Sequence, residues 1–423
     1  MSLVEKELTM QNVERANLSP EFASSREREQ KFMATDKWQS EVLFKDSAQP
    51  IEQIYLSAPE DEFSLRVRCI YDSEGNEYTA TLKDGGKVID GARDRLEVST
   101  PISQEAFEQY AANPKLARVR KLRTEIEDGV TVDFIEGIEL PIFEIENNNP
   151  AERAELTRNL QSLLNEPMVE LTGNEDFDNE HIAHRLSGTE RGKSPESLDA
   201  FTERVLAEMV ANYVVGRNQV VVGLTGMSGS GKTTVTKALQ ERIVELYGEG
   251  LKPIVLSTDD YHFGKTKLEE TYGAPYIAWD DAKTYNTAEL AFDLQQLAEG
   301  VPLIKRHFDF DTEEPAFDEE LSVSPFVIIE GLYASSDDLS EVRDLHFELP
   351  TSIATSIGRD VRRLIIDNRK NRAFPTASSR LRYQIETAAP LYLSQEMPER
   401  RGFSASSRPL AERAFMLAKL REQ

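Results

Sequence analysis

The stretch Gly226-Met227-Ser228-Gly229-Ser230-Gly231-Lys232-Thr233 fits the pattern G-x-x-x-x-G-K-[ST]. The apolar run Val220-Val221-Val222 comes before it, and a helix-forming sequence starts at Lys232. Glycines in such a loop let backbone N–H groups curl around phosphate oxygens, and the N-terminus of the helix adds about half a positive charge. We therefore predict a phosphate-binding loop between a buried strand and a helix.

Two side chains of this loop are suited to a nucleotide with a divalent cation. Lys232 is expected to reach the β- and γ-phosphates, and the hydroxyl of Thr233 to bind Mg²⁺. The residues expected to bind the nucleotide are Gly226, Ser228, Gly229, Ser230, Gly231, Lys232, Thr233 and Thr234. The predicted cofactors of this part of the chain are ATP and Mg²⁺.

Strands and helices alternate from about residue 197 onward, which predicts a parallel, doubly wound α/β sheet of the P-loop NTPase type. Strands are expected at 219–224, 253–257, 326–329 and 345–349, and helices up to 213, at 232–247, at 288–298 and from 353. Asp259 follows the second of these strands and Glu330 the third. Because an open α/β sheet binds ligands at the carboxyl ends of its strands, these carboxylates are candidates to accept a proton and to hold Mg²⁺.

The last of these helices carries a row of arginines. Arg359, Arg362 and Arg363 lie three and four residues apart on one face, and Arg369 and Arg372 follow. A mobile helix with these arginines would close over a triphosphate and neutralise charge in the transition state. A solvated basic helix face is the alternative, and the spacing leaves both interpretations open.

Five motifs in serial order, over roughly 219–372, resemble those of the uridine kinase and phosphoribulokinase family. They are the loop at 226–233, Ser257-Thr258-Asp259-Asp260-Tyr261-His262, Trp279-Asp280-Asp281-Ala282-Lys283-Thr284-Tyr285, His307-Phe308-Asp309-Phe310 and Val327-Ile328-Ile329-Glu330-Gly331-Leu332. The resemblance implies an ATP-dependent phosphotransferase.

The same resemblance implies a role for individual residues. Asp259 is implied to be the general base on the acceptor hydroxyl, Asp280 a ribose-binding carboxylate, and Glu330 the Walker-B-type acid that holds the metal. Lys232, Arg363 and Arg372 complete the implied catalytic set, the two arginines as lid residues. Tyr261 and Phe308 are expected at the acceptor site with Asp280.

The chain departs from this family where a pyrimidine base would be read. Phe308 stands where a tyrosine is expected, and the acidic Glu313 lies near the position of an expected histidine. A phenyl ring cannot donate a hydrogen bond, so discrimination between acceptors would be lost. Kinase chemistry is therefore better supported than uridine as the acceptor.

Short runs of alternating apolar and polar residues fill about 27–146 and predict seven or eight strands of a largely antiparallel barrel or sandwich. Charged residues recur at i and i+2, as in Glu27, Glu29 and Lys31, so they share one face of their strand. If such faces turn inward, basic groups would hold a polyphosphate, and Glu27, Glu29 and Glu144 or Glu146 would bind Mg²⁺ or Mn²⁺. A solvated sheet face is the alternative.

These charged residues also resemble, in order, those of the CYTH or triphosphate tunnel metalloenzyme family, over roughly 21–149. The resemblance implies an α+β antiparallel tunnel that binds triphosphate with a divalent cation. Its implied metal ligands are Glu27, Glu29, Glu144 and Glu146, and its implied phosphate-binding residues are Lys31, Arg66, Arg68, Lys83, Arg95, Lys121 and Arg123. Ser99 departs from the family, because a second acid often follows the one at Glu97.

Composition limits the partners. The 423 residues include 49 basic and 75 acidic side chains, a net charge of −26, and such a surface repels nucleic acid and anionic lipid. Nucleotides and polyphosphates are therefore expected to bind in local basic pockets. Cys69 is the only cysteine and no signal peptide or spanning segment is recognisable, so a cytoplasmic location is predicted. A homo-oligomer stays open.

We predict a tunnel domain at 1–175, a linker at 176–200 and a kinase-like domain at 201–423. The expected protein is a bifunctional enzyme. Its kinase domain phosphorylates a nucleoside such as uridine or another small hydroxyl compound, and its tunnel domain binds or hydrolyses a tri- or pyrophosphate. In one alternative the kinase-like domain only binds ATP and regulates the tunnel hydrolase, and in another the protein is a non-catalytic sensor.

Overall fold

The computed structural model describes residues 26–35, 37–165, 168–189, 196–214, 219–276, 278–366 and 374–394. The chain divides into two compact units. Unit 1 consists of Met1–Ser194 and Ile357–Glu386, and unit 2 of Pro195–Ser356 and Thr387–Gln423. No helix within the described ranges is long and apolar enough to cross a membrane.

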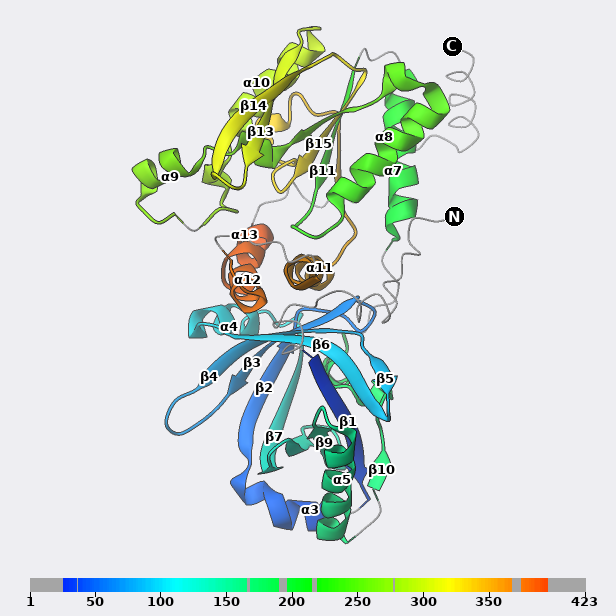
Figure 1. Cartoon of the computed structure of the whole chain (residues 1–423), viewed down its shortest axis with the longest axis vertical. Helices are drawn as coiled ribbons and strands as arrows, with labels where there is room; N and C mark the ends of the chain where they lie inside the picture. The colour runs from blue at the N-terminus through cyan, green and yellow to red at the C-terminus, as the bar shows by residue number, and fades with distance from the viewer. Residues whose placement is uncertain are drawn as a thin grey trace. The chain divides into compact units, whose positions relative to one another are not determined.

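Unit 1 is built around a closed antiparallel barrel (Figure 1). Eight strands follow one another in the order β1-β9-β8-β7-β2-β3-β4-β6, and β6 pairs back to β1. They are β1 (Arg26–Ala34), β2 (Gln49–Tyr55), β3 (Phe63–Ile70), β4 (Glu77–Asp84), β6 (Ala92–Pro101), β7 (Ala117–Glu127), β8 (Val130–Ile135) and β9 (Ile142–Glu146). The short strands β5 (Lys87–Ile89) and β10 (Met168–Glu170) pair with β6 and β1. This confirms the antiparallel strands predicted from the alternation and decides for a barrel between the two predicted alternatives, a barrel and a sandwich.

The register of the barrel turns its charged faces inward. Glu29 of β1 lies opposite Glu146 of β9, and Lys31 lies opposite Glu144. Glu29, Lys31 and Glu144 are buried even though each carries a charge. The structure therefore adopts the inward arrangement rather than the solvated face.

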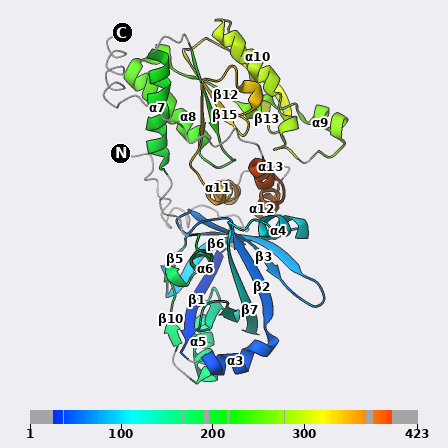
Figure 2. The ribbon, with the colours of Figure 1, turned by 180° about the vertical axis from the view of Figure 1, so that it is seen from behind.

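Helices cover apolar parts of the outer face. The helices α3 (Lys37–Phe44) and α5 (Pro150–Leu164) lie together at one end of the barrel in both views (Figure 1 and Figure 2). The buried cluster that joins them to the sheet includes Phe44, Val130, Val132, Phe143, Ile145, Leu160 and Leu164. The sequence pattern predicts a helix from residue 151 to 164, and α5 confirms it.

The helix α6 (Asn179–Ser187) fills part of the barrel interior. Ile182 and Ala183 share a buried cluster with Tyr55 and Val119, which lie on the inner face of β2 and β7. The sequence predicted a linker at 176–200, whereas residues 179–187 of it form this helix within unit 1. The linker prediction missed α6 because its apolar face is only two or three residues wide.

The remaining elements of unit 1 are mostly short helices. They are η1 (Lys45–Ser47), α4 (Gln104–Ala111), η2 (Glu175–Phe177), α12 (Ala377–Tyr383) and most of α11 (Ile353–Ile366) and of the π-helical turn η7 (Gln384–Ala388). Ser378 of α12 donates to the Ser99 carbonyl at 3.0 Å, and the Tyr110 hydroxyl of α4 donates to the Ile385 carbonyl at 2.8 Å. The described residues between 357 and 386 thus belong to the barrel unit, although the sequence predicted them as part of the kinase-like domain.

Unit 2 contains a four-stranded parallel sheet in the order β12-β15-β11-β16. Its strands are β11 (Val220–Thr225), β12 (Ile254–Ser257), β15 (Phe326–Gly331) and β16 (Leu345–Glu348). Every residue of β11 is buried, as is typical of parallel strands covered on both faces. The non-sequential strand order confirms the predicted doubly wound α/β fold.

Helices cover both faces of this sheet. The helices α7 (Leu198–Val214) and α8 (Lys232–Tyr247) pack on one face, and α10 (Thr287–Ala298) packs on the other. The other elements of unit 2 are η3 (Glu249–Leu251), η4 (Thr258–Tyr261), α9 (Lys265–Tyr272), η5 (Ala282–Thr284), the hairpin β13 (Leu303–Asp309) and β14 (Glu314–Leu321), η6 (Asp337–Leu339) and α13 (Ala389–Ser394). The helix predicted from Leu410 lies outside the described residues.

Replacing Gly358 of α11 by alanine should destabilise unit 1. A β-carbon at this position would lie 2.2 Å from Cγ of the buried ring of Phe63, so the helix or the ring must move. Gly→Ala inside an open helix normally stabilises by about 1 kcal/mol, whereas overpacking a core costs about 1–3 kcal/mol. We expect a net loss of about 1 kcal/mol in the free energy of unfolding, measured by urea denaturation. Gly85→Ala is the matched control, because its β-carbon would meet nothing within 4 Å; equal stability of the two variants would contradict the packing.

Candidate functional site

The predicted phosphate-binding loop joins β11 to α8. Gly229 and Gly231 have φ angles of 83° and 100°, which L side chains rarely adopt, and Gly231 caps α8. The ammonium group of Lys232 donates to the carbonyl oxygens of Gly226 at 2.7 Å and Met227 at 3.0 Å, so it lies over the loop. Ser230 is buried and its hydroxyl oxygen has no hydrogen-bond partner in the described part of the chain.

Of the remaining loop residues, Ser228, Thr233 and Thr234 are exposed. The hydroxyl of Thr233 is therefore accessible at the first turn of α8, where a cation bound to phosphates would reach it. The loop thus has the backbone shape and the free hydroxyl that its sequence predicts.

The two carboxylates at the strand ends lie near each other and near Lys232. Glu330 pairs in register with Ser257 at the end of β12, and Asp259 follows two residues later in η4. Burial raises the pKa of Asp259, and the positive charge of Lys232 opposes this rise. Burial also raises the pKa of Glu330, where Lys232 lowers it and Asp259 raises it further.

Gly331 explains how these strand ends come so close. It has a φ angle of 146°, and a β-carbon there would lie 1.8 Å from the hydroxyl oxygen of Thr258. Only glycine allows this approach between β15 and η4, which brings Glu330 and Asp259 together.

The expected acceptor residues lie in an aromatic cluster. The ring of Phe308 lies 5.1 Å from that of His262 and 6.3 Å from that of Trp279, centre to centre. Asp280 follows Trp279, and its backbone carbonyl accepts from the Tyr333 hydroxyl at 2.7 Å. The buried hydroxyl of Tyr261 donates instead to Asp293 of α10 at 2.8 Å, so this tyrosine orients η4 on α10.

The acidic residues after Phe308 are held by α9. Glu313 has a φ angle of 61°, and its carboxylate accepts from Lys265 at 2.8 Å. Glu314 accepts from the backbone N–H of Thr266 at 2.8 Å and thereby caps α9. Glu313, which lies near the position of the histidine expected from the family, therefore binds Lys265 of α9.

The predicted lid arginines do not form one set. Arg359 donates to Glu62 at 2.7 Å and Arg362 lies 3.7 Å from the same carboxylate, all within unit 1. Arg363 is exposed and also belongs to the residues of unit 1. Arg369 and Arg372 lie outside the described residues. The lid roles of Arg363 and Arg372 stay predictions.

The barrel of unit 1 encloses a polar cavity of about 420 Å³. Its wall includes Glu27, Glu29, Lys31, Tyr55, Glu62, Arg66, Arg68, Lys83, Arg93, Arg95, Glu97, Arg123, Glu144, Glu146, Asp178, Glu180 and His181. Most of the charged residues singled out in the sequence therefore meet in one space. Lys121 is the exception, because its side chain is fully buried behind this wall and pairs with Asp133 at 2.6 Å.

The cavity is not basic. Eleven carboxylates line it, against seven lysines and arginines. The expectation that an anion would bind in a positively charged pocket is therefore wrong for this barrel. An anion of several charges needs additional cations to enter a wall with this balance.

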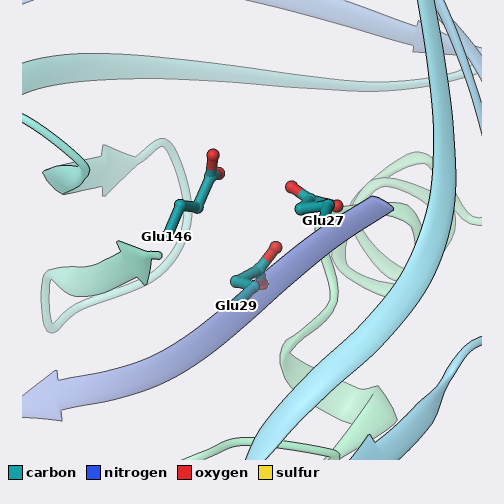
Figure 3. Close-up of side chains that lie close together, drawn as sticks. All are labelled: Glu27, Glu29 and Glu146. Carbon is teal, nitrogen blue, oxygen red and sulfur yellow. The ribbon is translucent and has the colours of Figure 1, made fainter. Parts of the chain in front are cut away.

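Three of the carboxylates gather as a candidate metal site. Oxygen atoms of Glu27, Glu29 and Glu146 lie within 4.8 Å of one another, from the ends of β1 and β9 (Figure 3). Burial, with the negative charge of Glu27, raises the pKa of Glu146 to about 7. Carboxylate oxygens are the donors that Mg²⁺ and Mn²⁺ prefer, so the donor set fits the predicted cation.

Basic side chains surround this group. Lys83 lies 2.9 Å from Glu27 and 2.9 Å from Glu97, and Arg95 donates to Glu27 at 2.8 Å and to Glu29 at 2.7 Å. Burial would raise the pKa of Glu97, but the charge of Lys83 lowers it well below its usual range. Glu97 therefore stays ionised, because Lys83 compensates its charge.

Glu144 lies apart from the three. It accepts from Arg123 and lies 3.3 Å from Lys31, and Arg123 also donates to Asp133 at 2.6 Å. Burial would raise the pKa of Glu144, but Arg123 and then Lys31 hold it well below the usual range. Of the two glutamates predicted for the end of the barrel, Glu146 is the one beside Glu27 and Glu29.

Two arginines of β3 carry free donors. The Nε atom of Arg66 is buried without a hydrogen-bond partner among the described residues, and Arg68 donates only weakly to Thr79 at 3.3 Å. Burial and the nearby Arg66 lower the pKa of Arg68 to about 10. Donors left unpaired on a cavity wall are suited to phosphate oxygens.

Sequence reasoning missed part of the wall. Arg93 pairs with Asp178, and Asp178 also lies 3.5 Å from Lys31. Arg93 could have been found, since it precedes Arg95 by two residues on the same face. Asp178 and Glu180 could not, because they reach the cavity only through the packing of η2 and α6 in the barrel.

Known proteins resemble both parts of the chain. A uridine kinase of Deinococcus deserti is 29% identical over 189 residues, which cover 43% of this chain and 83% of that protein. A uridine kinase of Leuconostoc citreum is 30% identical over 134 residues, covering 31% of this chain and 60% of that protein. A solved structure from Hippeastrum, described with a dominant triphosphatase activity, covers 39% of this chain and 98% of that chain with 14% identity and a TM-score of 0.30.

A family profile identifies one region directly. Residues 221–367 match the phosphoribulokinase/uridine kinase family. This range includes the loop, Asp259, Asp280, Glu330 and the whole of α11. This match supports a kinase function with ATP and a divalent cation for residues 221–367.

Proposed function

We propose that the barrel of unit 1 is a metal-dependent hydrolase of a condensed phosphate, and that unit 2 transfers the γ-phosphate of ATP to a small hydroxyl compound. The observation that carries the first part is the meeting of Glu27, Glu29 and Glu146 inside a cavity that also presents lysines and arginines. Metal-dependent hydrolysis of a phosphate chain has two requirements: carboxylates that hold the metal ion, and hydrogen-bond donors that bind the phosphate oxygens.

The residues of the barrel divide this work. Glu27, Glu29 and Glu146 would hold Mg²⁺ or Mn²⁺, which supplies polarisation of a phosphoryl group and activation of water. Arg66, Arg68, Lys83, Arg95 and Arg123 would bind phosphate oxygens, with Lys31 behind them. Closure of the barrel excludes bulk water and strengthens each of these interactions.

The lining of the cavity favours an inorganic condensed phosphate over a nucleotide. Tyr55 is the one benzenoid ring among the lining residues, it is 3% exposed, and no Val, Leu, Ile or Met side chain belongs to the wall. A base or another organic group would need aromatic or apolar surface to stack against. Tripolyphosphate and pyrophosphate are therefore the substrates we propose.

In unit 2 the proposed base is Asp259. Its raised pKa and its position near Lys232 suit a group that takes the proton of the acceptor hydroxyl as the γ-phosphate leaves. Glu330 and Thr233 would hold Mg²⁺, Lys232 would bind the phosphates, and Asp280 would orient the acceptor. We propose a nucleoside such as uridine or another small hydroxyl compound as the acceptor.

One observation favours the alternative in which unit 2 only binds ATP. Phe308 offers no hydrogen bond to an acceptor, and the carboxylate of Glu313 is engaged by Lys265. The presence of both Asp259 and Glu330 favours transfer, because a domain that only binds nucleotide needs no proton acceptor. A sensor without catalysis would show neither activity.

Glu29→Gln and Lys232→Ala should separate the two activities. Glu29→Gln removes a charge from the metal-binding carboxylates, so phosphate release from tripolyphosphate with Mg²⁺ or Mn²⁺ should fall by about 10²-fold or more while ATP binding stays unchanged. Lys232→Ala should abolish ATP binding in calorimetry and transfer of labelled γ-phosphate to a nucleoside panel, with tripolyphosphate hydrolysis unchanged.

Each variant serves as the control for the other. Retained hydrolysis by Glu29→Gln would contradict the barrel site, and retained ATP binding by Lys232→Ala would contradict the loop. ATP binding without transfer to any acceptor would leave unit 2 as a nucleotide-binding regulator.

The pH dependence of phosphoryl transfer should report Asp259. A base acts only when deprotonated, and a raised pKa means that activity is lost on acidification at a higher pH than for an ordinary aspartate. Asp259→Asn should lower kcat by about 10²–10⁴-fold with whichever compound of the nucleoside panel accepts the γ-phosphate. Asp260→Asn is the neighbouring control. The Asp260 carboxylate accepts from the Phe308 N–H at 3.1 Å, and the amide oxygen of asparagine can accept the same hydrogen bond. An acid limb near pH 4, or equal kcat for the two variants, would refute the role.

A further inference from the structure

Two of the three metal-binding carboxylates already form ion pairs with basic side chains of the cavity wall. Both oxygens of Glu27 accept from the ammonium of Lys83 at 2.9 Å. Arg95 donates to Glu27 at 2.8 Å and to Glu29 at 2.7 Å, and Lys31 lies 3.1 Å from the other oxygen of Glu29. The oxygens needed for a divalent cation are therefore the ones that these side chains now neutralise.

The third carboxylate differs from the other two. Glu146 is the most exposed residue of the three, although its carboxylate is partly removed from water, and no ion pair joins it to another side chain in the described ranges. A divalent cation can therefore approach Glu146 without displacing anything, whereas access to Glu27 and Glu29 requires that Lys83 and Arg95 move away.

The same two cations are the ones best placed to bind phosphate. Lys83 and Arg95 both line the cavity beside the metal-binding carboxylates. If they bound phosphate oxygens without a metal ion, Lys31 would be the only one of the three cations named above left beside Glu27, Glu29 and Glu146, whose oxygens lie within 4.8 Å of one another. If a metal ion bound while they stayed in place, it would lie against two positive groups. Each half of the complex is unfavourable alone.

We infer that Lys83 and Arg95 are exchangeable counter-ions, released from Glu27 and Glu29 by the divalent cation and passed to the phosphate chain. This rests on the proposed function of the barrel and adds a binding order to it. The metal ion and the condensed phosphate bind with positive coupling, and each raises the affinity of the other by the same factor. Lys83 and Arg95 thereby weaken the binding of either ligand alone to the acid-rich cavity.

Lys83→Met tests this exchange through metal binding in the absence of any phosphate. The variant removes the competitor on Glu27, so Mg²⁺ or Mn²⁺ alone should bind about tenfold tighter by calorimetry than to the wild type. A side chain that only binds phosphate predicts no change or a small general charge effect. Arg93→Met measures that general effect, because Arg93 lines the same cavity but pairs with Asp178 rather than with the metal-binding carboxylates.

The outcomes separate the inference from the proposed function. Tighter metal binding by Lys83→Met than by Arg93→Met supports the exchange, and equal affinities overturn it. If neither the wild type nor Lys83→Met binds Mn²⁺, the metal site itself fails. Arg95→Gln repeats the test should Lys83→Met not fold, as judged by circular dichroism.

A measurement on the unaltered protein provides an independent check. Sulfate is a small oxyanion that binds Mn²⁺ weakly in water, and it can take Lys83 and Arg95 from the glutamates. Titration of Mn²⁺ followed by its electron paramagnetic resonance should show several-fold tighter binding with saturating sulfate than with chloride at equal ionic strength. Unchanged or weaker Mn²⁺ binding in sulfate would overturn the exchange.

Discussion

The closure of the barrel through the β1–β6 pairing is the constraint on which the first unit depends. Each strand has two faces, and when the sheet closes into a barrel the side chains of one face point into the enclosed interior. In this chain the enclosed face carries charges, and charges removed from water must be compensated by neighbours. The ion pairs of Lys31, Lys83, Arg95 and Arg123 with the inner glutamates satisfy that requirement. The charged, enclosed cavity follows from this closure.

The two units place carboxylates beside a cation by different means. The barrel achieves it by cross-strand register, which sets Glu29 opposite Glu146. The parallel sheet achieves it at its strand ends, where Gly331 lets Glu330 approach Asp259 near Lys232. In both places burial raises the pKa of at least one carboxylate, Glu146 in the barrel and Asp259 in the sheet. Both arrangements suit the binding of phosphate groups together with a divalent cation.

Sequence alone predicted what is encoded locally. Period-two alternation predicted the barrel, and the loop at 226–233 with its flanking strand and helix predicted the α/β unit. Spacing brought Glu27 and Glu29 to one face, but it could not choose between Glu144 and Glu146, because that choice depends on the register between β1 and β9. Asp178 and the attachment of residues 357–386 to the barrel depend on packing between segments far apart in the chain, which no local pattern records. The charge balance of the cavity likewise emerged only when every lining residue was known.

The central claim is that an acid-rich, enclosed cavity accepts a condensed phosphate together with a divalent cation. Anomalous diffraction from crystals of the full chain soaked with Mn²⁺ and tripolyphosphate tests it most directly. The account predicts a manganese peak between Glu27, Glu29 and Glu146, with phosphate oxygens bound to Lys83 and Arg95. Manganese elsewhere in the barrel, or tripolyphosphate bound in the cavity with Lys83 and Arg95 still paired to Glu27 and Glu29, would contradict it.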